Sequence, residues 1–429
     1  MLKNVNIAIL ILVFPLFLFC KDQDYKYTKI LAYQPGCDSA AIHTGLDLLI
    51  QNNFETIKKK KIAVVCNKGS FDRNGSHILD IFSDRKDLQL VSIIQVVEKV
   101  YSSESSGMVI FADSINPLKN VTISPFQPTV FREDLNGANL ILIDLQNIGI
   151  RYENTLDVLI SLMNLSAKTR IPLVFLDRPN PITASITEGP LAANSNLVPD
   201  ARIPWRYGLT LGELALLINE ESWIPGKKGA RLYLIPMVNY DRSLWFDQTG
   251  LPWGIPLDEI YTIEMLLSYC TTCFFKYSNI INGEGSLFPY EVGGAPWISG
   301  PVIIELLNRQ ELSGVEFSLA TFVPGSKINV LMTSQYIGQE CTGIRINIRN
   351  RKIYRTSQTG SYLIGIIAQL YPRHFHWVNP SVIDQLFGDS IYRVMVDTGR
   401  NLKQLYPIWI SGMTDFQKLR QKYRLYDDN

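Results

Sequence analysis

The feature that most constrains the fold is a short apolar run that stops at charged residues. Residues 173–176 are Leu-Val-Phe-Leu, followed directly by Asp177 and Arg178 and then by prolines at positions 179 and 181. A short run that is apolar throughout is typical of a strand buried on both faces of a parallel sheet. The prolines exclude a continuing helix. Ligands of open α/β sheets bind beyond the carboxyl ends of strands, so Asp177 and Arg178 are site candidates. The alternative is an ion pair that only closes the loop.

Three earlier apolar runs end in polar residues in the same way. With the residues that end them, they are 62–66 with Asn67, 89–97 with Glu98, and 140–143 with Asp144 and Gln146. Helical patterns separate the runs, and this alternation predicts a Rossmann-like, doubly wound α/β domain. The carboxyl ends of parallel strands meet at one edge of a sheet. We therefore expect these polar groups to surround one pocket.

A second α/β domain is expected after this first one. Gly226-Lys-Lys-Gly229 interrupts the pattern and is typical of a linker. Further strands and helices are predicted beyond it, at 231–238, 257–275, 328–332, 343–348, 361–370 and 415–423. The sequence therefore predicts a Rossmann-like catalytic domain over residues 37–226 and a C-terminal α/β domain over residues 230–429.

The N-terminus has the pattern of an export signal. Lys3 precedes an apolar run over residues 5–19, and Cys20 follows it. The run is shorter than the ~20 residues that a membrane-spanning helix needs. The pattern resembles a bacterial lipoprotein signal over residues 1–20, with a membrane anchor through lipid on Cys20 and a tether over 21–36. It predicts a periplasmic or cell-envelope protein; simple export and an uncleaved anchor are the alternatives.

Charge and motif content exclude several other classes. The formal charge is +1 and the longest lysine run is four residues, so we expect no nucleic-acid partner. His374 and His376 have no acidic or cysteine neighbour in the sequence, and we expect no metal site. Gly283-Glu-Gly285 lacks the third glycine of a dinucleotide fingerprint, and we expect no cofactor. Cys270 and Cys273 have a spacing that fits either packed thiols or one disulfide.

Four longer motifs begin at Asp144, Leu176, Glu188 and Tyr207: DLQNIGIR, LDRPNP, EGPL and YGLTLGELA. They resemble a large bacterial family of exo-β-N-acetylmuramidases, which release N-acetylmuramic acid from the non-reducing end of peptidoglycan fragments. Shorter similarities at 67–80, 278–291 and 294–297 extend the resemblance, in matching order, over nearly the whole mature chain. The resemblance implies a Rossmann-like domain, a smaller α/β domain, and a pocket between them.

The chain departs from this family at polar positions. Lys68, Lys99 and Tyr207 stand where the family has histidine, and Asn282 stands where it has glutamate. Its aromatic-Thr-aromatic run is replaced by Glu-Asn-Thr over residues 153–155. Glu284 stands where the family places arginine. A negative charge there is expected to weaken binding of the lactyl carboxylate of muramic acid.

A glycosidase needs a proton donor at the leaving oxygen and, in most cases, a second group opposite it. We expect Glu98 to be the general acid, because partial desolvation beside an apolar strand would raise its pKa. Asp144 or Asp177 is expected to activate water or orient the sugar. The predicted substrate-binding residues are Asn67, Gln146, Arg151, Arg178, Asn180, Glu188, Arg206, Asn279 and Glu291. The competing hypothesis is a lipid-anchored protein that binds cell-wall saccharides and has lost turnover.

Overall fold

The computed structural model describes residues 25–33, 40–97, 119–123, 129–194, 198–226, 228–325 and 336–428. The strands are β1 (Thr28–Ile30), β2 (Lys61–Cys66), β3 (Gln89–Val96), β4 (Lys119–Ile123), β5 (Leu140–Asp144), β6 (Leu173–Leu176), β7 (Glu188–Asn194), β8 (Val198–Arg206), β9 (Leu232–Ile235), β10 (Val292–Ala295), β11 (Val315–Phe322) and β12 (Cys341–Ile348). The α-helices are α1 (Gly45–Gln51), α2 (Ile78–Ser83), α3 (Asn154–Thr169), α4 (Leu211–Glu220), α5 (Ile263–Thr272), α6 (Gly300–Asn308), α7 (Thr356–Leu370), α8 (Pro380–Phe387), α9 (Ile391–Asp397) and α10 (Leu405–Gln421). Short 3-10 helices are η1 (Arg132–Leu135), η2 (Phe246–Gln248), η3 (Phe275–Tyr277) and η4 (Leu402–Gln404).

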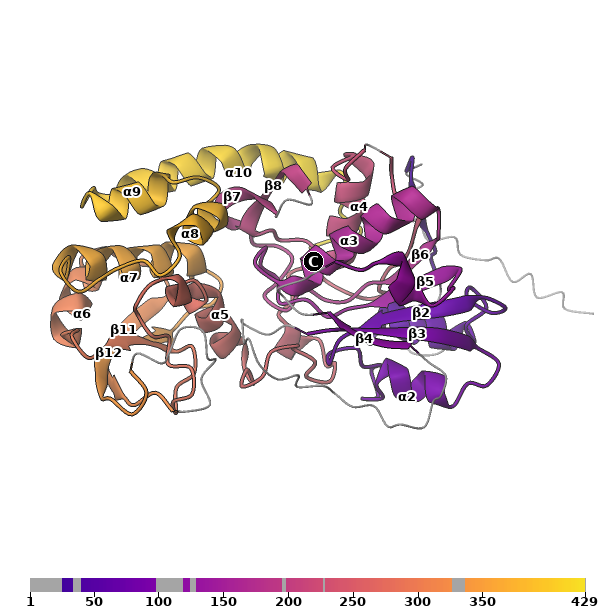
Figure 1. Cartoon of the computed structure of the whole chain (residues 1–429), viewed down its shortest axis with the longest axis horizontal. Helices are drawn as coiled ribbons and strands as arrows, with labels where there is room; N and C mark the ends of the chain where they lie inside the picture. Colours follow the sequence, from indigo (N-terminus) through magenta and orange to yellow (C-terminus); the bar gives the residue numbers. More distant parts are fainter. Residues whose placement is uncertain are drawn as a thin grey trace, which may run out of the picture.

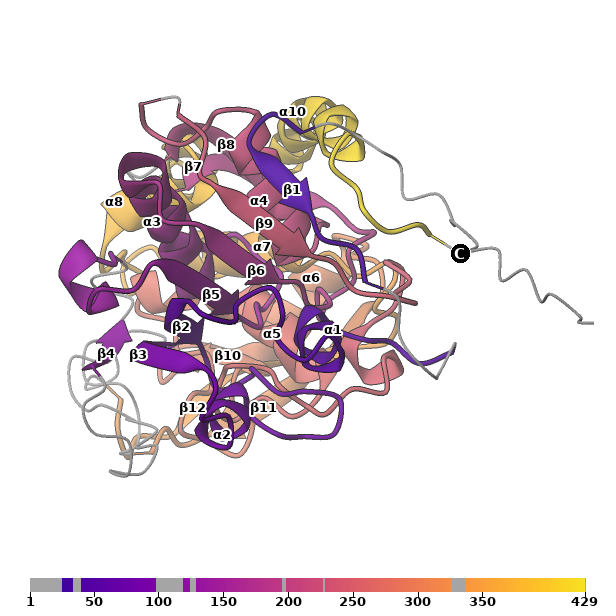
Figure 2. The same cartoon turned by 90° about the vertical axis from the view of Figure 1, so that its right-hand side faces the viewer.

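A seven-stranded sheet organises the N-terminal domain (Figure 2). Its order is β1-β9-β6-β5-β2-β3-β4, and every neighbouring pair is parallel. From β2 the chain proceeds outward through β3 to β4, and from β5 it proceeds the other way through β6 to β9. The topological switch point, where ligands of such sheets bind, therefore lies between β2 and β5. This confirms the predicted doubly wound α/β domain.

Helices cover both faces of this sheet because successive strand residues point to opposite sides. Along β2, Ile62 and Val64 pack in a core with residues of α1 and α2. The intervening Ala63 and Val65 pack with residues of α3 and α4. The strands are buried on both faces, which explains their unbroken apolar character.

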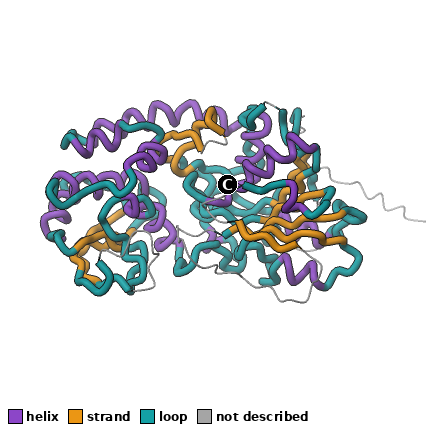
Figure 3. Tube along the Cα trace, viewed as in Figure 1, coloured by secondary structure: helices purple, strands orange, loops and turns teal. Residues whose placement is uncertain are grey.

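The C-terminal domain is built on a three-stranded antiparallel sheet of order β10-β12-β11 (Figures 1 and 3). Apolar residues of α5, α6, α7 and β12 share one core with Ile148 and Trp205 of the first domain. The apolar core is therefore continuous across the domain boundary. Helix α10 then runs back along β7 toward the first domain (Figure 1), where Phe416 and Tyr423 join the core under α3 and α4.

The structure differs from two predictions about domain organisation and contains strands that the sequence analysis did not predict. The expected tether over 21–36 contains β1, which pairs with β9 at the edge of the sheet. The expected boundary at residue 226 precedes β9, yet β9 lies inside the first sheet beside β6. Strands β4, β7, β8, β10 and β11 were not predicted, and the strand expected at 328–332 lies outside the described residues. Strand pairing over long sequence separations decides the places of β1 and β9, and local composition does not report it. None of the described helices is both long and apolar enough to cross a membrane.

Candidate active site

The carboxyl ends of the central strands bring together several of the predicted polar residues. β2 leads to Asn67, β5 ends at Asp144, and β6 leads to Asp177 and Arg178. These strands are neighbours in the sheet, on either side of the switch point. The prediction that separate strands deliver polar groups to one edge is confirmed for these residues.

Asp144 and Arg178 form a buried ion pair between adjacent strand ends. Arg178 Nε donates to Asp144 Oδ1 at 2.5 Å, and Arg178 Nη2 donates to Asp144 Oδ2 at 2.7 Å. Their side chains are 0% and 4% exposed, respectively. The Ser70 hydroxyl donates to the Asp144 carbonyl at 2.6 Å. This bond attaches the loop after β2 to the end of β5. The guanidinium binds both carboxylate oxygens of Asp144. The ion pair therefore holds the ends of β5 and β6 together, and Asp144 is not placed to activate a water molecule.

Asp177 has a structural role, which contradicts its predicted part in catalysis. Its fully buried carboxylate accepts hydrogen bonds from the N–H of Arg178 (3.0 Å) and Gly212 (2.9 Å) and from the hydroxyls of Thr210 (2.7 Å) and Tyr426 (2.6 Å). The carboxylate thus stands at the N-terminus of α4, where the helix dipole favours negative charge. A Cβ at Gly212 would lie 2.6 Å from an Asp177 oxygen, so only glycine fits there. Burial raises the pKa of Asp177 to about 7, and the donors of Tyr426, Thr210 and Gly212 oppose that shift.

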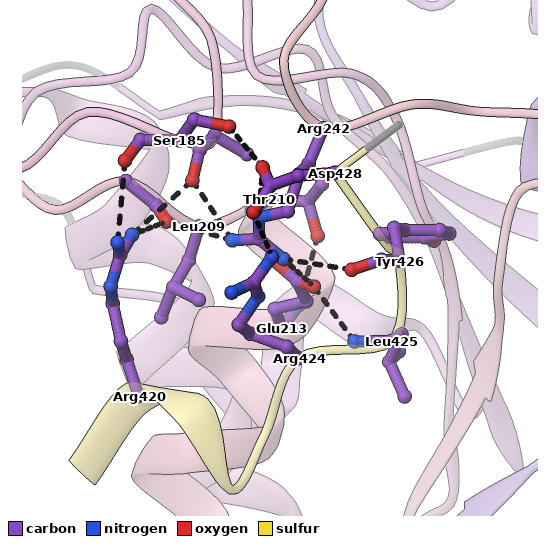
Figure 4. Close-up of polar contacts among 12 residues, drawn as sticks. Ser185, Leu209, Thr210, Glu213, Arg242, Arg420, Arg424, Leu425, Tyr426 and Asp428 are labelled. Carbon is purple, nitrogen blue, oxygen red and sulfur yellow. Dashed lines mark hydrogen bonds and ion pairs between the residues drawn. The ribbon is translucent and has the colours of Figure 1, made fainter. Parts of the chain in front are cut away.

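The C-terminal tail, residues 425–428, packs against the start of α4 and the loops beside it (Figure 4). Arg242 is fully buried and donates to Glu213 Oε1 at 2.9 Å and to the Tyr426 carbonyl at 3.2 Å. The Leu425 N–H donates to the same Glu213 oxygen at 2.8 Å, and the Ser185 hydroxyl donates to Asp428 at 2.5 Å. Since α10 carries the tail back from the C-terminal domain, these contacts hold the two domains together. The sequence analysis did not identify this tail.

The predicted amide residues divide into two groups. Asn67, Asn180 and Asn279 use both amide atoms on nearby main chain: Asn67 on Gly69 and Gln146, Asn180 on Ile182 and Leu209, and Asn279 on His374 and His376. These three side chains close loops. Gln146 Nε2 donates to the carbonyls of Asn147 (3.1 Å) and Pro179 (3.0 Å), but its buried Oε1 accepts no hydrogen bond from any described residue. Among the four amide side chains predicted to bind substrate, Gln146 is therefore the one whose oxygen, Oε1, no described residue uses.

Arg151 and Glu188 make contacts between the domains, and Arg206 pairs with Glu188 inside the first domain. Arg151 Nη2 donates to the Leu386 carbonyl at 2.8 Å, and burial lowers the pKa of Arg151 to about 9. Arg206 is fully buried, with Nη1 3.9 Å from Glu188 Oε1. That glutamate oxygen also accepts from the Thr356 N–H at 2.9 Å. The described contacts therefore give Arg151 and Glu188 a role in joining the two halves of the molecule, with Arg206 beside Glu188.

A polar cluster that the sequence analysis missed lies where C-terminal loops meet the strand-end loops. Lys276 Nζ lies 4.8 Å from the ring centroid of Tyr152, just before α3. Lys68, just after β2, pairs with Asp258 at 2.5 Å. Burial lowers the pKa of Lys276 to about 7 and raises that of Glu284 to about 7, while the two charges oppose each other's shifts. The available sequence signal was a lone lysine within the apolar, aromatic run Phe-Phe-Lys-Tyr over residues 274–277.

The remaining predicted residues lie elsewhere. Glu98 and Cys20 are outside the described residues. Val97, which precedes Glu98, accepts a hydrogen bond from Asn154 Nδ2 at 3.0 Å, so the end of β3 lies against the start of α3. Glu291 belongs to the C-terminal domain, where it pairs with Arg345 at 2.7 Å.

Two observations in the described part of the chain concern metal binding and the cysteines. No group of three or more His, Cys, Asp or Glu side chains there is arranged to hold a metal ion. Cys270 and Cys273 are both free, buried thiols. Burial raises the pKa of Cys273 to about 12, so this sulfur stays protonated near neutral pH.

Comparison with protein-family models places both halves of the chain in one family. The N-terminal model of the exo-β-N-acetylmuramidase NamZ matches residues 62–264, and the C-terminal model matches residues 267–426. The division between the models agrees with the structure, in which β9 belongs to the first domain.

Individual proteins show the same relationship. The peptidoglycan β-N-acetylmuramidase NamZ of Bacillus subtilis is 28% identical over 394 residues, which cover 90% of this chain and 91% of that protein. Two crystal structures of DUF1343 family proteins from Bacteroides fragilis share the fold, with TM-scores of 0.79 and 0.70. Each is 24% identical and covers 91% of this chain and 100% of its own. The chain belongs to the exo-β-N-acetylmuramidase NamZ family.

Proposed function

We propose that this chain is an exo-acting glycoside hydrolase that releases N-acetylmuramic acid, or a related amino sugar, from the non-reducing end of peptidoglycan fragments. The observation that carries the proposal is family membership across both domains. The polar strand ends beside the switch point support it, because that is where a sheet of this topology binds its ligand.

The general acid in this proposal is Glu98. A proton donor is needed at the leaving oxygen. Asp144 is held at both oxygens by Arg178, and Asp177 is enclosed by four donors, so neither presents an oxygen to a substrate. Glu98 is the remaining predicted acid, and it follows β3, the neighbour of β2 in the sheet. Gln146 Oε1 supplies an acceptor for a hydroxyl or acetamido N–H of the sugar.

The test is hydrolysis of a chromogenic β-N-acetylmuramide by the wild type and by Glu98→Gln. We expect the variant to lose at least about a hundredfold in kcat, the lower range of what general acid catalysis contributes, with an unchanged Tm. The matched control is Glu305→Gln, which removes an exposed glutamate on α6 and should keep full activity. Equal activity of Glu98→Gln would remove Glu98 from the mechanism. No release by the wild type, together with saturable binding of the sugar, would support a non-catalytic binding protein instead.

The proposal includes export and attachment to the cell envelope through lipid on Cys20. The basic residue, apolar run and cysteine within residues 1–20 support it. The wild type should incorporate labelled fatty acid and partition with membranes, whereas Cys20→Ala should do neither. Equal labelling of the two proteins would contradict lipidation at Cys20.

A further inference from the structure

A row of exposed basic side chains lies where the strands of the large sheet begin. Strands β1, β9, β6, β5 and β2 are consecutive neighbours and run parallel, so the segments that lead into them meet at one edge of the sheet. That edge is opposite the one that bears Asp144 and Asp177. The exposed basic residues just before or at the start of these strands are Lys26, Lys59, Lys60, Lys61, Lys168, Arg170, Lys228 and Arg231. We call this surface the basic edge.

Hydrogen bonds between neighbouring segments make the basic edge one continuous surface. Arg170 Nη1 donates to the Gly229 carbonyl at 3.1 Å, which joins the segments before β6 and β9. The Lys61 N–H donates to Asn139 Oδ1 at 3.0 Å, which joins the segments before β2 and β5. The Lys26 N–H donates to Glu220 at the end of α4 at 2.8 Å, beside the segment that leads to β9. The basic side chains are therefore gathered on one surface.

Few acidic side chains offset this charge. Those in the same segments are Glu55, Glu220 and Glu221. Glu55 pairs with Lys58, Glu220 also accepts from the Tyr27 N–H at 3.0 Å, and Glu221 accepts from the Tyr423 hydroxyl at 2.6 Å. The acidic residues of η1 lie by β3 and β4, to one side of this surface. Since the formal charge of the whole chain is only +1, the basic edge carries positive charge that the rest of the chain balances.

Helix dipoles explain only part of this pattern. Lys168 lies in the last turn of α3, where a cation complements the negative end of the helix dipole. The lysines at 59–61 follow a turn after α1, which ends at Gln51, and Lys228 follows α4, which ends at Glu220. These residues lie beyond the last turn of a helix, where the dipole effect has decayed. The remaining lysines are therefore available to attract an external anionic surface.

The N-terminal segment reaches the molecule at the same place. The Tyr25 ring centroid lies 6.3 Å from that of Tyr423, and β1 follows directly, beside β9 (Figure 2). Cys20 is five residues before Tyr25. A fully extended chain spans at most about 3.6 Å per residue, so the two Cα atoms are at most about 18 Å apart. Lipid on Cys20 would therefore keep the basic edge close to the bilayer.

We propose that the basic edge docks on an anionic phospholipid surface while lipid on Cys20 holds the protein there. Lysine and arginine near a negatively charged leaflet are attracted to it, and a basic patch is a second signal that strengthens a lipid anchor. Docking through this edge turns the opposite edge, with Gln146, away from the bilayer and toward soluble substrates. The inference rests on the proposed anchor and adds the surface and the lipid chemistry that orient the protein.

Lysine footprinting on vesicles tests the proposal. The mature protein is bound to vesicles of phosphatidylcholine alone or of phosphatidylcholine mixed with phosphatidylglycerol, in about 0.1 M NaCl. A water-soluble acetylating reagent is added, and mass spectrometry gives the rate at each lysine. Lys59, Lys60, Lys168 and Lys228 should react at least about fivefold more slowly on the anionic vesicles, and about 1 M NaCl should remove the difference. Lys352 and Lys403, exposed in the C-terminal domain, should react equally on both vesicles.

Charge reversal on the basic edge is compared with the same reversal elsewhere. Lys60→Glu combined with Lys228→Glu should reduce the protection of Lys59 and Lys168 on anionic vesicles to less than about twofold, with an unchanged Tm. The matched control, Lys352→Glu combined with Lys403→Glu, changes the net charge equally and should keep the full protection. Equal wild-type reactivity of the basic edge on both vesicles would overturn the proposal. Protection by soluble polyphosphate, with none by anionic vesicles, would also overturn it, because the surface would then suit a soluble polyanion.

Failure of the anchor gives a different result. Without lipid on Cys20, the protein would not sediment with phosphatidylcholine vesicles, which refutes the anchor alone. Docking is then measured by sedimentation with the anionic vesicles in about 0.02 M NaCl, where screening is weak. The Lys60→Glu and Lys228→Glu combination should weaken that binding at least about fivefold relative to the control pair. No sedimentation of the wild type under these conditions would overturn the docking proposal as well.

Discussion

Tyr426→Phe tests whether the C-terminal tail stabilises the strand ends. The Tyr426 hydroxyl donates to Asp177 Oδ2 at 2.6 Å and accepts from the Met237 N–H at 2.9 Å. Phenylalanine keeps the ring, whose centroid lies 5.1 Å from that of Tyr240, and removes both hydrogen bonds. A hydrogen bond to a charged group contributes about 1.5–3 kcal/mol, and a buried N–H left unpaired costs about 1–3 kcal/mol. Added together, these contributions lead us to expect that the variant loses about 2.5–6 kcal/mol of unfolding free energy.

The neighbouring tyrosine provides the matched control. Tyr240 is 6% exposed, packs edge-to-face on Tyr426, and makes no hydroxyl hydrogen bond of good geometry with any described residue. Tyr240→Phe therefore removes the same atom from the same environment without breaking a bond, and its unfolding free energy should stay within about 0.5 kcal/mol of wild type.

The unfolding free energies of the three proteins are compared by urea denaturation at pH 8, monitored by tryptophan fluorescence and analysed with a common m-value. A loss below about 0.5 kcal/mol for Tyr426→Phe would refute the reasoning. Equal losses in the two variants would also refute it, because removal of a buried hydroxyl group, rather than loss of its two hydrogen bonds, would then account for the change.

Three further predictions concern the buried charges and thiols. Asp144→Asn should cost about 3–5 kcal/mol in urea denaturation, because it leaves the Arg178 guanidinium buried without its carboxylate; a loss below 1 kcal/mol would argue against the ion pair. Burial raises the pKa of Asp177 from 3.8 to about 7, so its stabilising contribution is present below pH 3.8 and is lost as pH rises through 7. Asp177→Asn should therefore gain stability relative to wild type as pH rises from 4 to 8, and a difference that is constant with pH would contradict the shift. Cys270 and Cys273 should resist a thiol reagent in the native protein and react fully in denaturant, as peptide mapping would show; rapid native labelling would place them at the surface.

Asp144 and Asp177 show what a local sequence pattern can and cannot predict about the role of a residue. Their positions at the ends of apolar strands were visible in the sequence, and the structure confirms that both lie at the same sheet edge. Their partners were not visible. Asp144 is held by Arg178, 34 residues away, and Asp177 by Tyr426, 249 residues away. Whether a buried carboxylate is catalytic or structural depends on which donors surround it, and those donors come from distant segments.

The sequence by itself determined the parallel sheet, because strands buried on both faces must be apolar throughout and this pattern is local. It also determined where polar groups would gather, since parallel strands end at a common edge. Tertiary structure alone decided that Thr28–Ile30 and β9 belong to that sheet, that the C-terminal tail encloses Asp177, and that Lys276 lies over the Tyr152 ring. These contacts join segments far apart in the chain. Their energies come from hydrogen bonds and burial that exist only once the domains have packed.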